Sequence, residues 1–293
     1  MRLPDRATGE AQRQEDDVLH GALYAAAGVG AHAHGPLAQQ VRHDADVVRG
    51  QADERAFVVA QPAVGAEDQD LSEIELAKQD QNPITRFYVM RFEDNVQLGF
   101  GPDDEPINFF RIQPLIPLKL GKALGRDWTL LTRAIIPIAH VPWPESTDGL
   151  SDISVIAFLT PSRSGNFVWG AGPALLLPTA TDDLLGTGKW SAGPAVAGIY
   201  MNGPWVVGAI AQNFWSFAGD DDRSDVNTMT LRPIVNYNLP HGWYLTSSPS
   251  IAANWEADAD ERWLVPVGGG VGKVYSIGRQ RMSTTIESYY HAV

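Results

Sequence analysis

The connections between the predicted strands of this chain alternate between two kinds, and no other feature limits the possible folds as strongly. One kind is tight, as at Asn202-Gly203 and Gly278-Arg279, and the other is longer or acidic, as at 142–151 and 218–225. Because the two kinds take turns, successive hairpins open toward opposite ends of one antiparallel meander. Greek-key sandwiches do not sort their loops in this way, whereas outer-membrane β-barrels keep short turns on one side and longer loops on the other.

The strands themselves alternate apolar and polar side chains with a period of two residues. We predict eleven of them, at residues 86–99, 107–119, 127–141, 152–161, 166–178, 189–201, 204–217, 226–239, 242–255, 262–276 and 280–293. In two of these strands one face carries Leu231, Val235, Leu245 and Ile251, and the other carries Arg232 and Thr246. A soluble barrel would turn the apolar face inward and a membrane barrel would turn it outward.

The tryptophans favour the membrane case. Within single strands, Trp205 and Trp215 are separated by an even number of residues, as are Trp243 and Trp255, so each pair lies on one face. Roughly ten tilted residues span a bilayer core, and two aromatic rings at that separation are typical of membrane interfaces. The alternative is that tryptophans cap both ends of a soluble core. We assign all nine to the interface girdle: Trp128, Trp143, Trp169, Trp190, Trp205, Trp215, Trp243, Trp255 and Trp263.

Composition narrows the functional classes. Lys and Arg number 22 against 35 Asp and Glu, and a formal net charge of −13 excludes a basic nucleic-acid binder. The absence of cysteine excludes a disulfide scaffold, a thiol nucleophile and a Cys-based metal site. No segment approaches the roughly 18–20 apolar residues of a membrane helix. Alternating β-strands average to neutral hydropathy, so the composition does not exclude a β-barrel.

The N-terminal region differs from the rest. Residues 1–71 are poor in aromatic residues and show no sustained hydrophobic period, so we predict a disordered leader. It lacks the features of a signal peptide, and His32 and His34 have no further metal ligands at fixed spacing. Ser72 and Glu75 form a capping box, which predicts a short helix over 72–80. We expect residues 72–293 to form the barrel, with strands from residue 86.

Polar residues on the other strand face are the candidates for a transport path. A charged side chain in mid-strand faces lipid only at high cost, so the arginines should line the lumen and favour anions or polar solutes. Alternatively, they pair with Glu287 and plug the barrel. Leu131, Ile135 and Ile234 share that face, and a partly apolar lumen suits small hydrophobic or aromatic solutes. The candidates are Arg111, Gln113, Arg133, Arg232, Asn236, Tyr244, Thr246, Ser248 and Glu287.

Other motifs do not support a catalytic or cofactor site. The acidic loop 220–225 has oxygen ligands but lacks the terminal Glu of a calcium loop. In 268–273, Val267 and Val274 occupy positions where a phosphate loop needs Gly and Ser or Thr. A barrel hydrolase would need a Ser beside a His, and the histidines from residue 86 onward have no such partner by spacing. We therefore expect no enzyme, no cofactor and no metal.

Several stretches in the second half resemble a known family: LLGTGKWSAGP (184–194), GPWVVG (203–208), VNYNLP (235–240) with GWYL (242–245), and VPVGGG (265–270). The chain is similar, from about Leu76 to its end, to a bacterial outer-membrane β-barrel transporter family, the phenol-degradation pathway-associated group, often mislabelled neuromedin U. The resemblance implies a barrel of twelve strands with a transport role. Family members end in one further strand, so we expect this chain to lack the final strand. We also expect residues 1–71 to be non-native.

These observations together predict an all-β protein, an antiparallel up-and-down transmembrane β-barrel in the outer membrane of a Gram-negative cell. We expect a channel or transporter for small solutes, hydrophobic or aromatic ones among them. The expected partners are membrane lipid and a small-molecule solute, with no nucleic acid. The alternatives are a structural or plugged barrel without transport, an outer-membrane hydrolase and a soluble β-barrel binding protein.

Overall fold

The computed structural model of the chain describes residues 52–63, 78, 81–85, 87–100, 104–123, 125–143, 145–259, 261–278 and 280–291. These residues form one 15-stranded sheet in which all pairs are antiparallel. No helix in the described ranges has the length and apolar character to cross a membrane. Of the helix predicted over 72–80, only Lys78 lies within the described residues.

The strands are β1 (Ala52–Ala63), β2 (Val89–Phe100), β3 (Glu105–Ala123), β4 (Arg126–Val141), β5 (Thr147–Leu150), β6 (Ile153–Pro161), β7 (Phe167–Leu177), β8 (Lys189–Asn202), β9 (Trp205–Gly219), β10 (Asn227–Asn238), β11 (Trp243–Ser247), β12 (Ile251–Asn254), β13 (Trp263–Leu264), β14 (Pro266–Ile277) and β15 (Gln280–His291). Each predicted strand is present. The strand predicted at 242–255 is interrupted between β11 and β12, where Pro249 has no N–H to donate to the ladder.

β1 was not predicted. It lies within the segment assigned to a disordered leader, and it pairs with β15 on one side and β2 on the other. The leader assignment is therefore wrong for Ala52–Ala63, whereas residues 1–51 and 64–71 lie outside the described ones. Following the pairs from β10 through β11, β14, β15, β1, β2, β3, β4, β6, β7, β8 and β9 leads back to β10. β15 corresponds to the last predicted strand, and it has a neighbouring strand on both sides, β14 and β1.

The two faces of the sheet differ in exposure along nearly every strand. In β15 buried and exposed residues alternate from Thr285 to His291, and β11 alternates in the same way. Leu245 and Val235 lie on the exposed face, while Thr246 lies on the buried face and Arg232 is half-buried. The exposed face of these strands is therefore mainly apolar and the buried face carries the charged residues, the arrangement that a membrane barrel requires and a soluble barrel does not.

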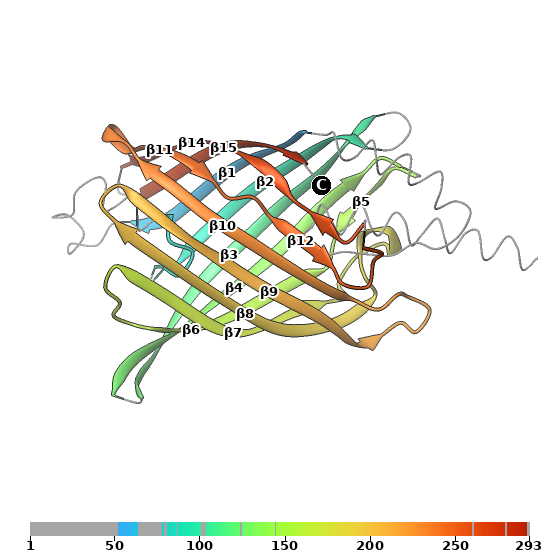
Figure 1. Cartoon of the computed structure of the whole chain (residues 1–293), viewed down its shortest axis with the longest axis horizontal. Helices are drawn as coiled ribbons and strands as arrows, with labels where there is room; N and C mark the ends of the chain where they lie inside the picture. The colour runs from blue at the N-terminus through green and yellow to red at the C-terminus, as the bar shows by residue number, and fades with distance from the viewer. Residues whose placement is uncertain are drawn as a thin grey trace, which may run out of the picture.

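The connections separate into two groups at opposite ends of the strands (Figure 1). The tight turns, such as those after β3 and β8, lie at the left end of the view, and the longer loops, such as the one between β9 and β10, lie at the right. Gly203 in the β8–β9 turn has a φ of 53° and Gly278 in the β14–β15 turn has a φ of 60°. Glycine adopts these left-handed conformations without steric cost, which fits the tight turns.

Candidate functional site

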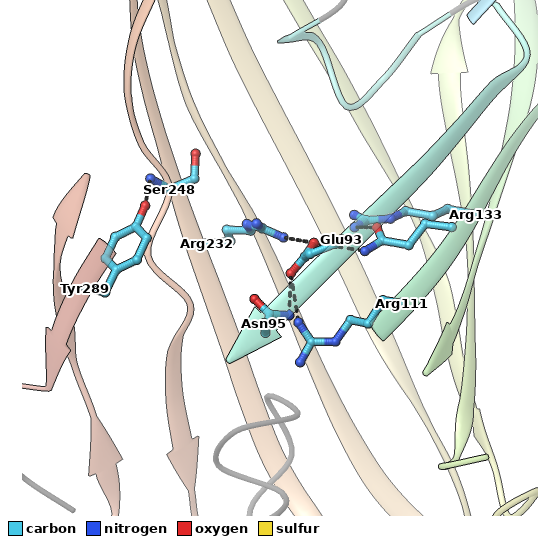
Figure 2. A network of polar contacts seen from close by, with 8 residues as sticks. Glu93, Asn95, Arg111, Arg133, Arg232, Ser248 and Tyr289 are labelled. Carbon is cyan, nitrogen blue, oxygen red and sulfur yellow. Dashed lines mark hydrogen bonds and ion pairs between the residues drawn. The ribbon is translucent and has the colours of Figure 1, made fainter. Parts of the chain in front are cut away.

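Charged side chains converge on the buried face around one carboxylate, that of Glu93 on β2. Arg111 Nη1 on β3 lies 2.8 Å from Glu93 Oε1, and Arg232 Nη1 on β10 lies 3.7 Å from Oε2. The side-chain amides of Asn95 and Gln113 also donate to this carboxylate, at 3.0 and 2.9 Å. Glu93 is 1% exposed. Figure 2 shows arginines from separate strands turned toward it.

Among the described residues, arginines outnumber carboxylates here: Arg91, Arg111, Arg133 and Arg232 lie near Glu93, and Glu287 lines the same cavity. Arg133 on β4 is 5% exposed, and its Nη2 donates to the neutral amide oxygen of Gln113 at 2.5 Å. Arg91 also faces this region from β2, and within the described part of the chain the Nε atoms of Arg91 and Arg133 have no hydrogen-bond partner. A buried charge is costly unless it is paired, so an unbalanced cluster of this kind favours a bound anion.

Across the sheet, side chains of β11 and β15 meet over the glycine-rich strand β14. Tyr244 Oη lies 2.8 Å from Ser283 Oγ and 2.5 Å from Thr285 Oγ1. Its ring covers Gly272, where a Cβ atom would overlap the ring carbons. Gly272 therefore makes room for the Tyr244 ring, whose hydroxyl reaches across β14 to Ser283 and Thr285.

Two further contacts bridge the same strands. Thr246 Oγ1 donates to Glu287 Oε1 at 2.9 Å. The backbone N–H of Ser248, at the break between β11 and β12, donates to Tyr289 Oη at 2.6 Å (Figure 2). Tyr289 thus compensates a backbone donor that the interrupted ladder leaves without a strand partner.

A cavity lies between the arginine cluster and this bridged region. It has a volume of about 70 Å³, enough for roughly five waters at about 10–15 Å³ each. Most of its lining residues carry polar groups, and Pro83, Ile210 and Ile234 add apolar surface. The lining residues are Gln81, Pro83, Arg91, Arg133, Ile210, Arg232, Ile234, Asn236, Tyr244, Thr246, Ser248, Ser283, Thr285 and Glu287.

Another part of the buried face is apolar. A large cluster includes Leu131, Phe158, Ile199, Ile210 and Phe214, from strands β4 to β9. Leu131 and Ile234, predicted on the same face as the arginines, belong to it. The buried face therefore carries charged and apolar side chains on the same strands, as with Arg133 and Leu131 on β4.

At the long-loop end, the β7–β8 connection is fastened by the carboxylate of Asp152, which is 6% exposed. Asp152 Oδ1 accepts from the backbone N–H groups of Thr179 and Ala180 at 3.1 and 3.2 Å. Its Oδ2 accepts from Thr187 N at 2.6 Å and Thr187 Oγ1 at 2.7 Å. These bonds hold the loop with its short helix η2 (Asp183–Leu185), whose Leu185 packs in a second buried cluster.

At the tight-turn end, a segment between β1 and β2 packs against the buried face. Gln81 and Asn238 exchange side-chain hydrogen bonds at 2.8 and 3.2 Å. Ile84 is 3% exposed and belongs to the large apolar cluster. The cavity is therefore lined by part of this segment, Gln81 and Pro83, whereas the loop held by Asp152 lies at the other end of the strands.

The predicted transport-path residues lie together on this face. Arg111, Gln113, Arg133 and Arg232 join the Glu93 cluster, while Asn236, Tyr244, Thr246, Ser248 and Glu287 line the cavity. The sequence analysis missed Arg91, Glu93 and Asn95. Their signal was present, because they alternate with apolar Met90, Phe92 and Val96 in a predicted strand.

Most of the predicted girdle tryptophans lie on the exposed face at strand ends. The two rings of Trp128 and Trp169 pack edge to face at 6.2 Å near the tight turns, and those of Trp255 and Trp263 do so at 5.6 Å near the longer loops. Trp143 differs, because it packs against the buried cluster around Leu185. Those with at least 37% exposure are Trp169, Trp190, Trp205, Trp215, Trp243, Trp255 and Trp263.

Comparison with known proteins gives fold-level likenesses at low identity. No protein-family model and no curated protein matches the chain. The chain is similar to the crystal structure of an outer membrane channel from Pseudomonas putida F1, with 15% identity, a TM-score of 0.46, and coverage of 82% of this chain and 95% of that one. It is also similar to a deltaS2 mutant of the TodX monoaromatic hydrocarbon channel, with 10% identity, a TM-score of 0.30, and coverage of 82% and 88%. Among the described residues, no group of three or more His, Asp or Glu could hold a metal ion.

Proposed function

We propose that the chain forms a closed β-barrel in an outer membrane and conducts small solutes through its lumen. The ring of antiparallel pairs supports closure, because each strand in it has a partner on both sides. β12 and β13 extend β11 and β14, so the proposed barrel has the twelve strand positions that the family resemblance implies. Closure is what a sheet in lipid requires, since unpaired edge groups cannot bond to water there.

The single observation that carries the proposal is the reversed polarity of the sheet. Large apolar side chains in mid-strand, such as Val196 at 52% exposure, face outward, while Glu93 and Arg133 are enclosed. Water-soluble proteins rarely expose a continuous apolar surface of this extent. The exposed tryptophans near both strand ends fit the two interfaces of a bilayer.

The charged and apolar side chains of the buried face indicate the class of solute. Arginines attract anionic or polar groups, and the large apolar cluster accommodates apolar ones. Solutes with both characters, including small hydrophobic or aromatic molecules with a polar group, suit this lumen best. We assign the tight turns to the periplasmic side and the longer loops to the outside, following the usual asymmetry of outer-membrane barrels.

A plugged barrel without transport is the second candidate, and specific contacts favour it. Gln81 and Ile84 pack against the buried face near the tight turns, and Asp152 holds the β7–β8 loop in place at the other end. A barrel closed in this way would hold its shape and pass no solute. Transport therefore requires that at least the Asp152-fastened loop can move.

Single-channel recording on the full chain in a planar bilayer tests the proposal. We expect steady current from the wild type and a higher open probability from Asp152→Ala. The variant loses hydrogen bonds worth roughly 3 kcal/mol in total to the closed loop, or about a hundredfold in its population relative to the open loop. Asp221→Ala, an exposed position in another loop at the same end, is the control and should match the wild type. Silence from both the wild type and Asp152→Ala would support the plugged barrel instead.

A further inference from the structure

We propose that the cavity beside the arginine cluster binds a small monocarboxylate, with the carboxylate among Arg91, Arg133 and Arg232 and a short apolar tail against Ile210 and Ile234. The inference rests on the proposed function in one respect, since the lumen is the route by which the ligand would reach the site. It goes further by naming a ligand class and the residues that hold it.

The first observation is the balance of charge among the residues that line the cavity. Three arginines and one glutamate line it, so its described lining is positively charged. The nearby Glu93 carboxylate is already shared between Arg111 and Arg232 and is bonded by two amides. A single additional anion would balance much of what remains, and buried charges are stable only when they are balanced.

The second observation is that arginines supply hydrogen-bond donors at the cavity. Arg133 is more than nine-tenths buried, lines the cavity and uses one Nη on a neutral amide. Arg91 lines the same cavity. A guanidinium presents parallel N–H groups whose spacing matches the two oxygens of a carboxylate.

The size and the apolar part of the lining select among anions. The cavity volume of about 70 Å³ corresponds to a ligand of a few heavy atoms. Ile210 and Ile234, each 7% exposed, form an apolar surface in the same cavity. An inorganic anion would leave that surface covered by water, whereas a carboxylate with a short aliphatic tail would cover it with carbon. Propionate has the required size and both characters.

Isothermal titration of the full chain in detergent micelles with sodium propionate tests the inference. We expect saturable binding of propionate, no binding of propionamide, and weaker binding of chloride and phosphate. Arg91→Gln and Arg133→Gln should each weaken propionate binding about tenfold or more, because each removes charged hydrogen-bond donors. Arg163→Gln, in an exposed tight turn, is the matched control and should bind as the wild type does.

The comparison of propionate with propionamide needs no variant, so a variant that fails to fold leaves the test intact. Equal binding of the two compounds, or no binding of either, would overturn the inference, as would tighter binding of phosphate than of propionate. Bilayer recording separates this result from the proposed function. Current without propionate binding removes the monocarboxylate site and keeps the channel, and binding without current keeps the site and removes the channel.

Discussion

Glu93→Gln is expected to lower the free energy of unfolding by about 3–5 kcal/mol, the cost of leaving a buried charge without its partner. Glu93 is the carboxylate that Arg111 and Arg232 share, and it is enclosed on the buried face. Glutamine keeps the shape and part of the hydrogen bonding but removes the negative charge. Urea unfolding of the chain in lipid vesicles, followed by tryptophan fluorescence, measures the change.

The neighbouring residue provides the control. Asp94→Asn makes the same change of charge one residue along β2, on the opposite face, where Asp94 accepts from Asn108 Nδ2 at 2.7 Å. A carboxylate that faces lipid gains little from its charge, so this variant should be neutral within about 1 kcal/mol or more stable than the wild type. Equal losses at both positions would contradict the assignment of the buried and exposed faces.

Val196→Arg is expected to destabilise the protein in a bilayer by about 2–4 kcal/mol. Val196 lies near the middle of β8, is 52% exposed and therefore faces the centre of the proposed membrane. The cost of an arginine on the lipid face falls to about 1 kcal/mol or less near the interface. The same urea titration in vesicles reports both effects.

Depth is controlled by a second substitution of the same kind. Val207→Arg lies on the same face but only two residues from Trp205, at the tight-turn end of β9. It should cost much less than Val196→Arg. If both substitutions were tolerated equally, as on a water-exposed surface, the exposed face would not be in lipid.

The strands and their faces could be predicted because both depend on the local order of apolar and polar residues. A period of two in side-chain polarity defines a strand and its two faces without reference to any other part of the chain. The orientation of the faces needed one further signal, which the tryptophans at the strand ends supplied. The exposure of Leu245 and Val235 agrees with that interpretation.

The parts that were missed depend on distant partners. β1 has a short apolar run without a clear alternation, and it becomes a strand through pairing with β15, more than two hundred residues away. The role of Asp152 depends on backbone N–H groups in the β7–β8 loop, which no local pattern reveals. Trp143 was assigned to the girdle from its position near a loop, but packing against Leu185 decides its place.

The candidate site was predicted in outline because charged residues within a lipid-facing strand generally turn to the lumen; Asp94, bonded to Asn108 on the other face, is the exception on β2. That rule identified Arg111, Arg133 and Arg232, and it applies equally to Arg91 and Glu93. It could not show that the arginines surround a single carboxylate, since Arg232 on β10 is far in sequence from β2, β3 and β4. Nor could it locate a cavity, which depends on how the side chains of six strands and the segment near Gln81 pack together.

The quenching of tryptophan fluorescence by brominated lipids tests most directly whether the apolar face of this sheet lies in a bilayer. The full chain in phosphatidylcholine vesicles needs no substitution for this measurement, because seven exposed tryptophans lie near the strand ends. Lipids brominated close to the headgroup should quench strongly, and lipids brominated at the ends of the acyl chains should quench less. An absence of quenching by either lipid would show that these tryptophans do not contact the membrane, and would contradict the account.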